Sequence, residues 1–88
     1  MNMTLIEQFV YVTLFSKFGY RTFYSRELTS AIKFLLKNYK FTKDEILQSL
    51  TKFILDGALY RGKQAGKYSY RVVQNPRAEY KDLRSSIL

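Results

Sequence analysis

The chain has 88 residues, a net charge of +8 from 15 Lys and Arg against 7 Asp and Glu, and neither Cys nor His. A length of this order suits one domain with one modest core. Without Cys, the fold cannot depend on disulfides or on zinc held by thiolates. Without Cys and His, the commonest nucleophile, general base and soft metal ligands are missing, so we expect no enzyme, no metal and no cofactor. The positive charge requires an anionic partner: nucleic acid, a membrane surface or an acidic protein.

The N-terminal stretch MNMTLIEQFVYVTLF is apolar, but it lacks the basic start and the small-residue cleavage site of a signal peptide. Glu7 and Gln8 interrupt this stretch, which is also too short to span a bilayer. We therefore expect a protein that does not enter the membrane and that resides in the cytoplasm.

The first helix is expected from Leu5 to Lys17. Thr4 and Glu7 form a capping-box pattern at its start, and Gly19 can end it in the left-handed conformation. Because the helix is apolar on nearly all sides, it requires burial on two sides, and a homodimer interface provides this in so short a chain. The alternative is that a C-terminal helix of the same chain covers the second side. The expected interface residues are Ile6, Val10, Tyr11, Leu14, Phe15, Phe18 and Phe34.

A short β-prone stretch at residues 20–24 precedes a second helix, expected from Arg26 to Asn38 with Ser25 as its N-cap. The spacing of its apolar residues predicts a core stripe consisting of Leu28, Ala31, Ile32 and Leu35.

The third helix, expected over residues 42–56, has the clearest start signal. Thr42 and Glu45 form a second capping box, and Phe41 is spaced from Ile46 as in a hydrophobic staple. The expected core stripe consists of Ile46, Leu47, Leu50, Phe53 and Ile54. The opposite face is centred on Gln48 and Lys52, and its flanks carry Asp44, Glu45, Ser49 and Thr51.

After Gly57 the apolar residues alternate, which predicts strands at residues 58–62 and 67–73. The glycines that bound the segment between them indicate a hairpin loop over residues 62–66. We expect one domain over residues 1–76, followed by a short helical extension or a frayed tail at residues 77–88.

The charge is concentrated in the expected hairpin. Residues 58–73 carry four cations, Arg61, Lys63, Lys67 and Arg71, and no carboxylate, which favours contact with a phosphate backbone. A membrane-binding helix would carry its cations on the polar side of an apolar helix, but the most apolar helix here has only Lys17 near its end. We therefore expect nucleic acid, with an acidic protein as the alternative, rather than a membrane.

The order helix, short strand, helix, helix, strand, basic turn, strand resembles the winged helix-turn-helix family of DNA-binding proteins. The run FILDGALYRGKQAGKYSYRVV is similar to the second half of that motif, through Phe53, Gly57, Leu59, Arg61, Tyr68 and Tyr70. The resemblance implies a mainly helical α+β fold, with a three-helix core and a β-hairpin wing. Stand-alone winged helices of this size also resemble small regulators of viruses and plasmids.

Together with the expected dimer interface on the first helix, this resemblance implies a sequence-specific, homodimeric transcription regulator of double-stranded DNA. The helix at residues 42–56 would enter the major groove, and the wing at about residues 61–67 would touch the backbone or the minor groove. The implied DNA contacts are Arg26, Lys43, Gln48, Ser49, Lys52, Arg61, Lys63 and Lys67, with Gln48 as the base-reading residue. Two alternatives remain, because Asp44 and Glu45 oppose DNA: a protein-interaction module and a nonspecific architectural DNA binder.

Overall fold

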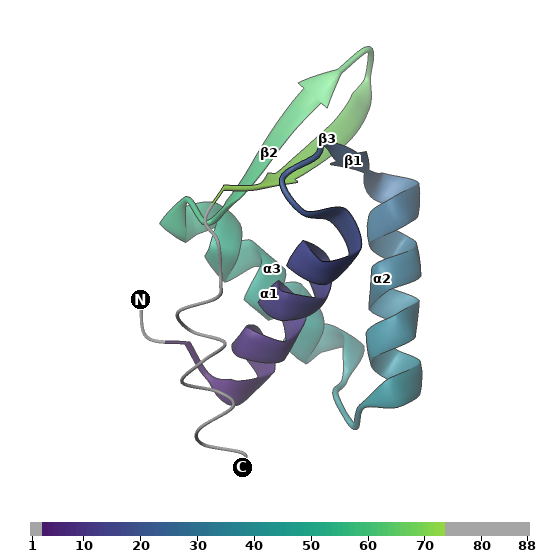
Figure 1. Cartoon of the computed structure of the whole chain (residues 1–88), viewed down its shortest axis with the longest axis vertical. Helices are drawn as coiled ribbons and strands as arrows, with labels where there is room; N and C mark the ends of the chain where they lie inside the picture. The colour runs from purple at the N-terminus through teal and green to yellow at the C-terminus, as the bar shows by residue number, and fades with distance from the viewer. Residues whose placement is uncertain (1–2, 74–88) are drawn as a thin grey trace.

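The computed structural model of the chain describes residues 3–73, which form three helices and one antiparallel sheet (Figure 1). The helices are α1 (Leu5–Phe18), α2 (Ser25–Asn38) and α3 (Lys43–Asp56), and the strands are β1 (Phe23–Tyr24), β2 (Leu59–Gln64) and β3 (Lys67–Val72). The strand order is β1-β3-β2, so β3 is the central strand. The expected mainly helical α+β class is confirmed, whereas the expected extension at residues 77–88 lies outside the described residues.

The capping boxes begin two of the helices as expected. The Thr4 hydroxyl accepts from the Glu7 N–H at 3.2 Å, and the Glu7 carboxylate accepts from the Thr4 N–H at 2.7 Å. Thr42 and Glu45 repeat this exchange at the start of α3, at 3.1 and 2.8 Å. The expected N-cap of α2 is wrong by one residue, because Ser25 is already helical. Tyr24 precedes the helix there, and its N–H donates to the Glu27 carboxylate at 3.3 Å.

The core lies between the three helices and the base of the sheet. On α2, Ala31 and Leu35 are buried and Leu28 and Ile32 pack against them, so the expected stripe of this helix is confirmed. The fully or nearly fully buried apolar residues are Val10, Tyr11, Leu14, Phe18, Phe23, Ala31, Leu35, Ile46, Leu50, Phe53, Ala58, Leu59, Tyr70 and Val72.

The expected dimer interface on the first helix is wrong for four of its residues. Val10, Tyr11, Leu14 and Phe18 are at most 8% exposed, because α1 packs against α2, α3 and β3 of its own chain. Phe18 stacks on Phe23 of β1, with ring centroids 4.0 Å apart. A second subunit cannot contact these side chains without opening the core. The side of α1 that carries these four residues is therefore buried within one chain.

A buried junction fixes the hairpin β2–β3 relative to the helices. Gly57 ends α3 with φ +80°, and the N–H groups of Gly57 and Ala58 donate to the carbonyls of Ile54 and Phe53 at 3.2 and 2.9 Å, in a Schellman motif. The Ala58 carbonyl then accepts from the Val73 N–H at 2.9 Å and from the buried Tyr11 hydroxyl at 3.1 Å. These bonds join α1, the end of α3 and both strands at one point.

The hairpin turn is tighter than expected. Gln64 pairs with Lys67, so only Ala65 and Gly66 form the loop, and the expected loop residues 62–64 belong to β2. Ala65 and Gly66 have φ values of +51° and +79°, and a type I′ turn requires positive φ at both positions. Ala65 is the only residue other than glycine with positive φ among residues 3–73.

We predict that Ala65→Asn raises the free energy of unfolding by about 0.5–1 kcal/mol, because Asn tolerates positive φ better than Ala does. Urea unfolding followed by circular dichroism measures the change. The matched variant Gly66→Ala introduces a side chain at φ +79°, where nothing lies within 4 Å to clash with it, and it should lower stability by about 1–2 kcal/mol through backbone strain alone. A loss of stability in Ala65→Asn would contradict the turn geometry.

Candidate nucleic-acid interface

The hairpin presents its side chains on two opposite faces, because successive residues of a strand point to opposite sides. The cross-strand pairs are Arg61 with Tyr70, Lys63 with Tyr68, and Tyr60 with Arg71. One face continues the core-facing side of the sheet, and we call it the core-side face; its exposed residues are Arg61, Lys63 and Tyr68. The other we call the far face; its exposed residues include Tyr60, Lys67 and Arg71.

Each face pairs cations with one exposed tyrosine. On the core-side face, the Arg61 guanidinium lies 5.2 Å and the Lys63 ammonium 5.7 Å from the centroid of the Tyr68 ring. On the far face, the Arg71 guanidinium lies 5.7 Å from the centroid of the Tyr60 ring. The Tyr60 ring lies along the strand above Gly62, where an added Cβ would come within 2.9 Å of its hydroxyl. The contacts between the cations and the tyrosine rings limit the positions that the long cationic side chains adopt.

None of the four hairpin cations forms a salt bridge with another residue of the described range 3–73. The ion pairs of that range, Arg21 with Glu27 and Lys52 with Glu7, lie on the helical body and on the segment that leads to β1. The hairpin charge is therefore not neutralised within this part of the chain.

An open groove of about 880 Å³ separates the hairpin tip from the first turn of α2. Arg26 and Lys67 line it from opposite sides, so the expected contact residue Arg26 lies beside the hairpin. Glu27, the carboxylate in the groove, binds Arg21 at 2.8 Å, and this hydrogen bond lowers the pKa of Glu27. The full lining is Tyr24, Ser25, Arg26, Glu27, Gln64, Ala65, Gly66, Lys67 and Tyr68.

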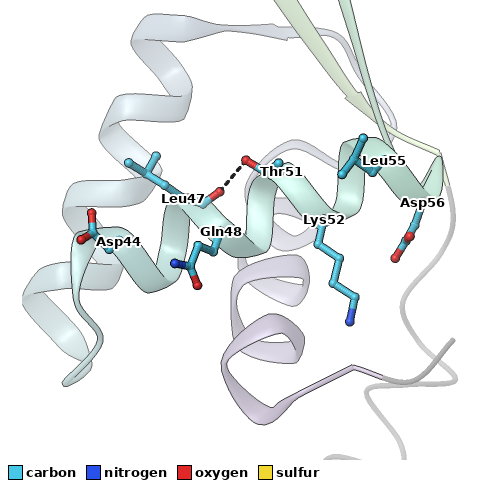
Figure 2. Close-up of a pocket in the computed structure, with 7 residues that line it drawn as sticks. All are labelled: Asp44, Leu47, Gln48, Thr51, Lys52, Leu55 and Asp56. Atoms are coloured by element: carbon cyan, nitrogen blue, oxygen red, sulfur yellow. Dashed lines mark hydrogen bonds between the residues drawn. The ribbon is translucent and has the colours of Figure 1, made fainter.

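The outward face of α3 is more acidic and more apolar than expected of a DNA-reading helix. Figure 2 shows this face, which borders a shallow hollow of about 420 Å³. Leu55 is 81% exposed, and Leu47, expected in the core, is 40% exposed. Asp44 and Asp56 lie near the two ends of the face (Figure 2). Gln48 is exposed, and it makes no hydrogen bond to another residue within 3–73.

Ser49 is wrong as an expected DNA contact. It is only 4% exposed, and its hydroxyl donates to the Glu45 carbonyl at 2.9 Å. This bond satisfies the hydroxyl, so the residue can be buried without an unpaired polar group. The buried stripe of α3 is thus rotated toward Ser49 and away from Leu47.

Lys52, also expected to hold phosphate, is engaged with α1. Its ammonium lies 3.2 Å from the Glu7 carboxylate, and Figure 2 shows its side chain extending from α3 toward α1. Burial raises the pKa of Glu7, but the hydrogen bonds from Thr4 and Lys52 and the charge of Lys52 outweigh burial and lower it overall. Lys52 therefore contributes to joining α1 to α3, and a phosphate would have to compete with Glu7 for it.

The remaining expected interface residues, Ile6, Phe15 and Phe34, are less buried than the core residues of α1. Ile6 and Phe15 are half-buried against the core, and Phe34 is 41% exposed. Lys17 lies 4.5 Å from the centroid of the Phe34 ring. A groove of about 330 Å³ runs there, lined by Phe9, Val12, Thr13, Ser16, Lys17, Phe34 and Tyr39.

The structure also shows candidate contacts that sequence reasoning left out of the expected set. Arg71 lies beside Lys67 on the far face of the hairpin. Lys33 and Lys37 follow Arg26 at helical spacing along the exposed side of α2. The i, i+7, i+11 spacing of these three cations was visible in the sequence and could have identified them.

Known proteins give no further guide to the function. Comparison with protein families, curated proteins and solved structures finds no match to this chain. Within residues 3–73, no group of three or more Asp and Glu side chains is placed to hold a metal ion. No helix of that range is both long and apolar enough to cross a bilayer.

We predict that Glu7→Gln lowers the free energy of unfolding by about 1–2 kcal/mol at pH 7, because the charged hydrogen bond to Lys52 is lost. The pKa of Glu7 is lowered by folding, so its carboxylate stabilises the fold above the unfolded pKa, and this contribution disappears as the pH falls through the folded pKa. The difference between wild type and variant should therefore shrink as the pH falls below about 4.5, the ordinary pKa of Glu. Urea unfolding at several pH values measures it.

Lys52→Gln removes the same ion pair from the side of α3 and should show the same pH dependence. A difference from wild type that stays constant down to the acid limit, in both variants, would contradict the proposed pairing.

Proposed function

We propose that this chain is a winged-helix protein that binds double-stranded DNA as a sequence-specific transcription regulator. The element order and the sheet order β1-β3-β2 are compatible with a winged helix, in which the hairpin β2–β3 is the wing. The alternatives differ in partner rather than in fold.

The proposal rests on the charge of the hairpin β2–β3. Four exposed cations stand on a two-stranded ribbon that extends from the helical body (Figure 1), and no carboxylate of residues 3–73 pairs with them. Each cation that meets a phosphate releases condensed counterions, which favours binding. A polyanion with regularly spaced charges satisfies this arrangement better than a scattered set of protein carboxylates.

Only two of the four expected DNA contacts of α3 are available at its surface. Lys43 and Gln48 are exposed and available, whereas Ser49 is buried and Lys52 binds Glu7. An amide such as Gln48 can pair with adenine in the major groove. Asp44 and Asp56 oppose a close approach of this face to phosphate.

The first experiment is selection from a randomised duplex pool, at about 50 and then about 200 mM salt, the range over which phosphate-driven affinity falls steeply. We expect an enriched site that survives the higher salt. Uniform loss of binding would instead indicate a nonspecific architectural protein.

The proposed regulator acts as a pair of identical chains, and Phe34 is the exposed residue of the expected interface that remains available for it. An enriched inverted repeat in the selected pool would support the pair, since a two-fold dimer binds two half-sites. A single half-site, together with a monomeric mass by sedimentation, would contradict it.

We predict that Lys63→Gln with Lys67→Gln weakens binding to every duplex and reduces the slope of log affinity against log salt by about 1.8, because two phosphate contacts are lost. Fluorescence anisotropy over a salt series measures this. The matched control, Lys17→Gln with Lys40→Gln, removes the same charge from two exposed residues outside the hairpin and should change the slope little. Equal slopes for both variants would indicate general attraction to a basic protein.

A second candidate is a protein-interaction module, because Leu47 and Leu55 lie exposed on α3 between Asp44 and Asp56. Exposed leucines of this kind can mark a protein contact. Absence of duplex binding at any salt would favour this function over the first.

A further inference from the structure

The two faces of the hairpin carry the same set of side chains. The core-side face has Arg61, Lys63 and the exposed ring of Tyr68; the far face has Arg71, Lys67 and the exposed ring of Tyr60. Each arginine lies within 6 Å of the tyrosine ring of its own face, at 5.2 and 5.7 Å. A hairpin that lay flat along one DNA backbone would use only one of these sets.

A ligand with phosphates on both sides of the hairpin would contact the cations and tyrosines of both faces. In a duplex, each groove is bounded by two phosphate backbones. We propose that the hairpin enters the major groove of duplex DNA tip first, with each face toward one backbone. This inference rests on the proposed DNA-binding function, and it names the element and the groove that carry it.

The dimensions select the major groove. The major groove is about 12 Å wide and admits a two-stranded β-ribbon, whereas the minor groove is only about 6 Å wide. Side chains on both faces make a ribbon about as thick as the spacing of packed sheets, roughly 10 Å. A ribbon with long cations and tyrosines on both faces therefore fits the wider groove.

The positions along the hairpin match the depth of that groove. At roughly 3.3 Å per residue, Arg61 lies about 13 Å from Ala65 at the tip, and Lys63 about 7 Å. The major groove is about 8.5 Å deep, so Gln64 and Lys67 lie inside it and Lys63 lies near its rim. Arg61, and Arg71 one row further from the tip, lie above the rim, from which their long side chains can reach the phosphates. Ala65 and Gly66 at the turn are small enough to approach the groove floor.

Gln64 is the residue that this placement assigns to base reading. It is exposed in the last strand row before the turn, opposite Lys67. Its carbonyl oxygen accepts from the Tyr24 hydroxyl at 3.5 Å, which orients the amide from the start of α2. An oriented amide can donate to and accept from an adenine edge in the major groove.

The acidic and apolar outward face of α3 agrees with this assignment. That face carries Asp44 and Asp56, whose charges repel phosphate, and the exposed Leu55, which offers phosphate no hydrogen bond. With the hairpin in the groove, α3 need not enter it.

Two double variants with matched charge test the two-sided contact. Arg61→Gln with Lys63→Gln removes the cations of the core-side face, and Lys67→Gln with Arg71→Gln removes those of the far face. On a mixed-sequence duplex, we expect each pair to reduce the salt slope by the same amount, about 1.8. A change in only one pair would overturn the proposal in favour of a hairpin lying flat on one backbone. Thermal unfolding checks that both variants fold, and Lys17→Gln with Lys40→Gln, which removes two cations outside the hairpin, serves as the charge-matched control.

Methylation interference on the duplex enriched from the pool tests the groove. We expect methylation of guanine N7, in the major groove, to block binding, and Gln64→Ala to reduce discrimination between sites about tenfold or more. Interference only by methylation of adenine N3, in the minor groove, would overturn the proposal. So would a loss of discrimination in Gln48→Ala that Gln64→Ala does not show. Failure of the wild type to bind any duplex would overturn the proposed function itself, a result distinct from these.

Discussion

The carbonyl of Ala58 is the point on which the placement of the hairpin depends. It accepts one hydrogen bond from the Tyr11 hydroxyl of α1 and one from the N–H of Val73, so α1 and both strands meet at a residue that directly follows the end of α3. The two donors satisfy both lone pairs of this buried carbonyl, so no polar group is left unpaired there. The left-handed Gly57 makes this possible, because it turns the chain out of α3 within one residue. The base of the hairpin is consequently bonded to the helical body, while its tip is exposed to solvent.

A second constraint acts at the other end of α1. Glu7 serves two roles with one carboxylate: it completes the capping box with Thr4, and it binds Lys52 of α3. The two interactions together offset the burial of the charge, which is why the pKa of Glu7 is lowered despite that burial. Because Lys52 pairs with Glu7, its charge contributes less to the surface of α3. Apart from Lys43, the exposed charged side chains of α3 are acidic, so most of the positive surface of the described residues lies on the hairpin and along α2.

Much of the fold could be predicted from the sequence, because its signals are local. The capping boxes at Thr4 and Thr42, the glycine after α3 and the alternation after it all depend on neighbours within a few residues. The errors concern information that is not local. The apolar character of α1 shows that it is buried but not by which chain, and the pairing of Glu7 with Lys52 spans 45 residues. Ser49 is buried and Leu47 is exposed, the reverse of what the sequence predicts. Ser49 can be buried because its hydroxyl bonds to the backbone of its own helix. Which side chains lie on each face of the hairpin depends on the position of the turn, because a shift of one residue in the strand pairing moves every side chain to the opposite face.

The composition of the hairpin tip is not explained by folding. The base of the hairpin contributes buried Leu59, Tyr70 and Val72 to the core, whereas residues 63–68 are all exposed. Cations on a short ribbon repel one another, and the exposed rings of Tyr60 and Tyr68 remove little apolar surface from water. These side chains therefore stabilise the free protein little or destabilise it. An anionic ligand reverses this balance, because it neutralises the repulsion and covers the rings at the same time. Since the set is present on both faces, the ligand that reverses it fully is one that borders the ribbon on both sides.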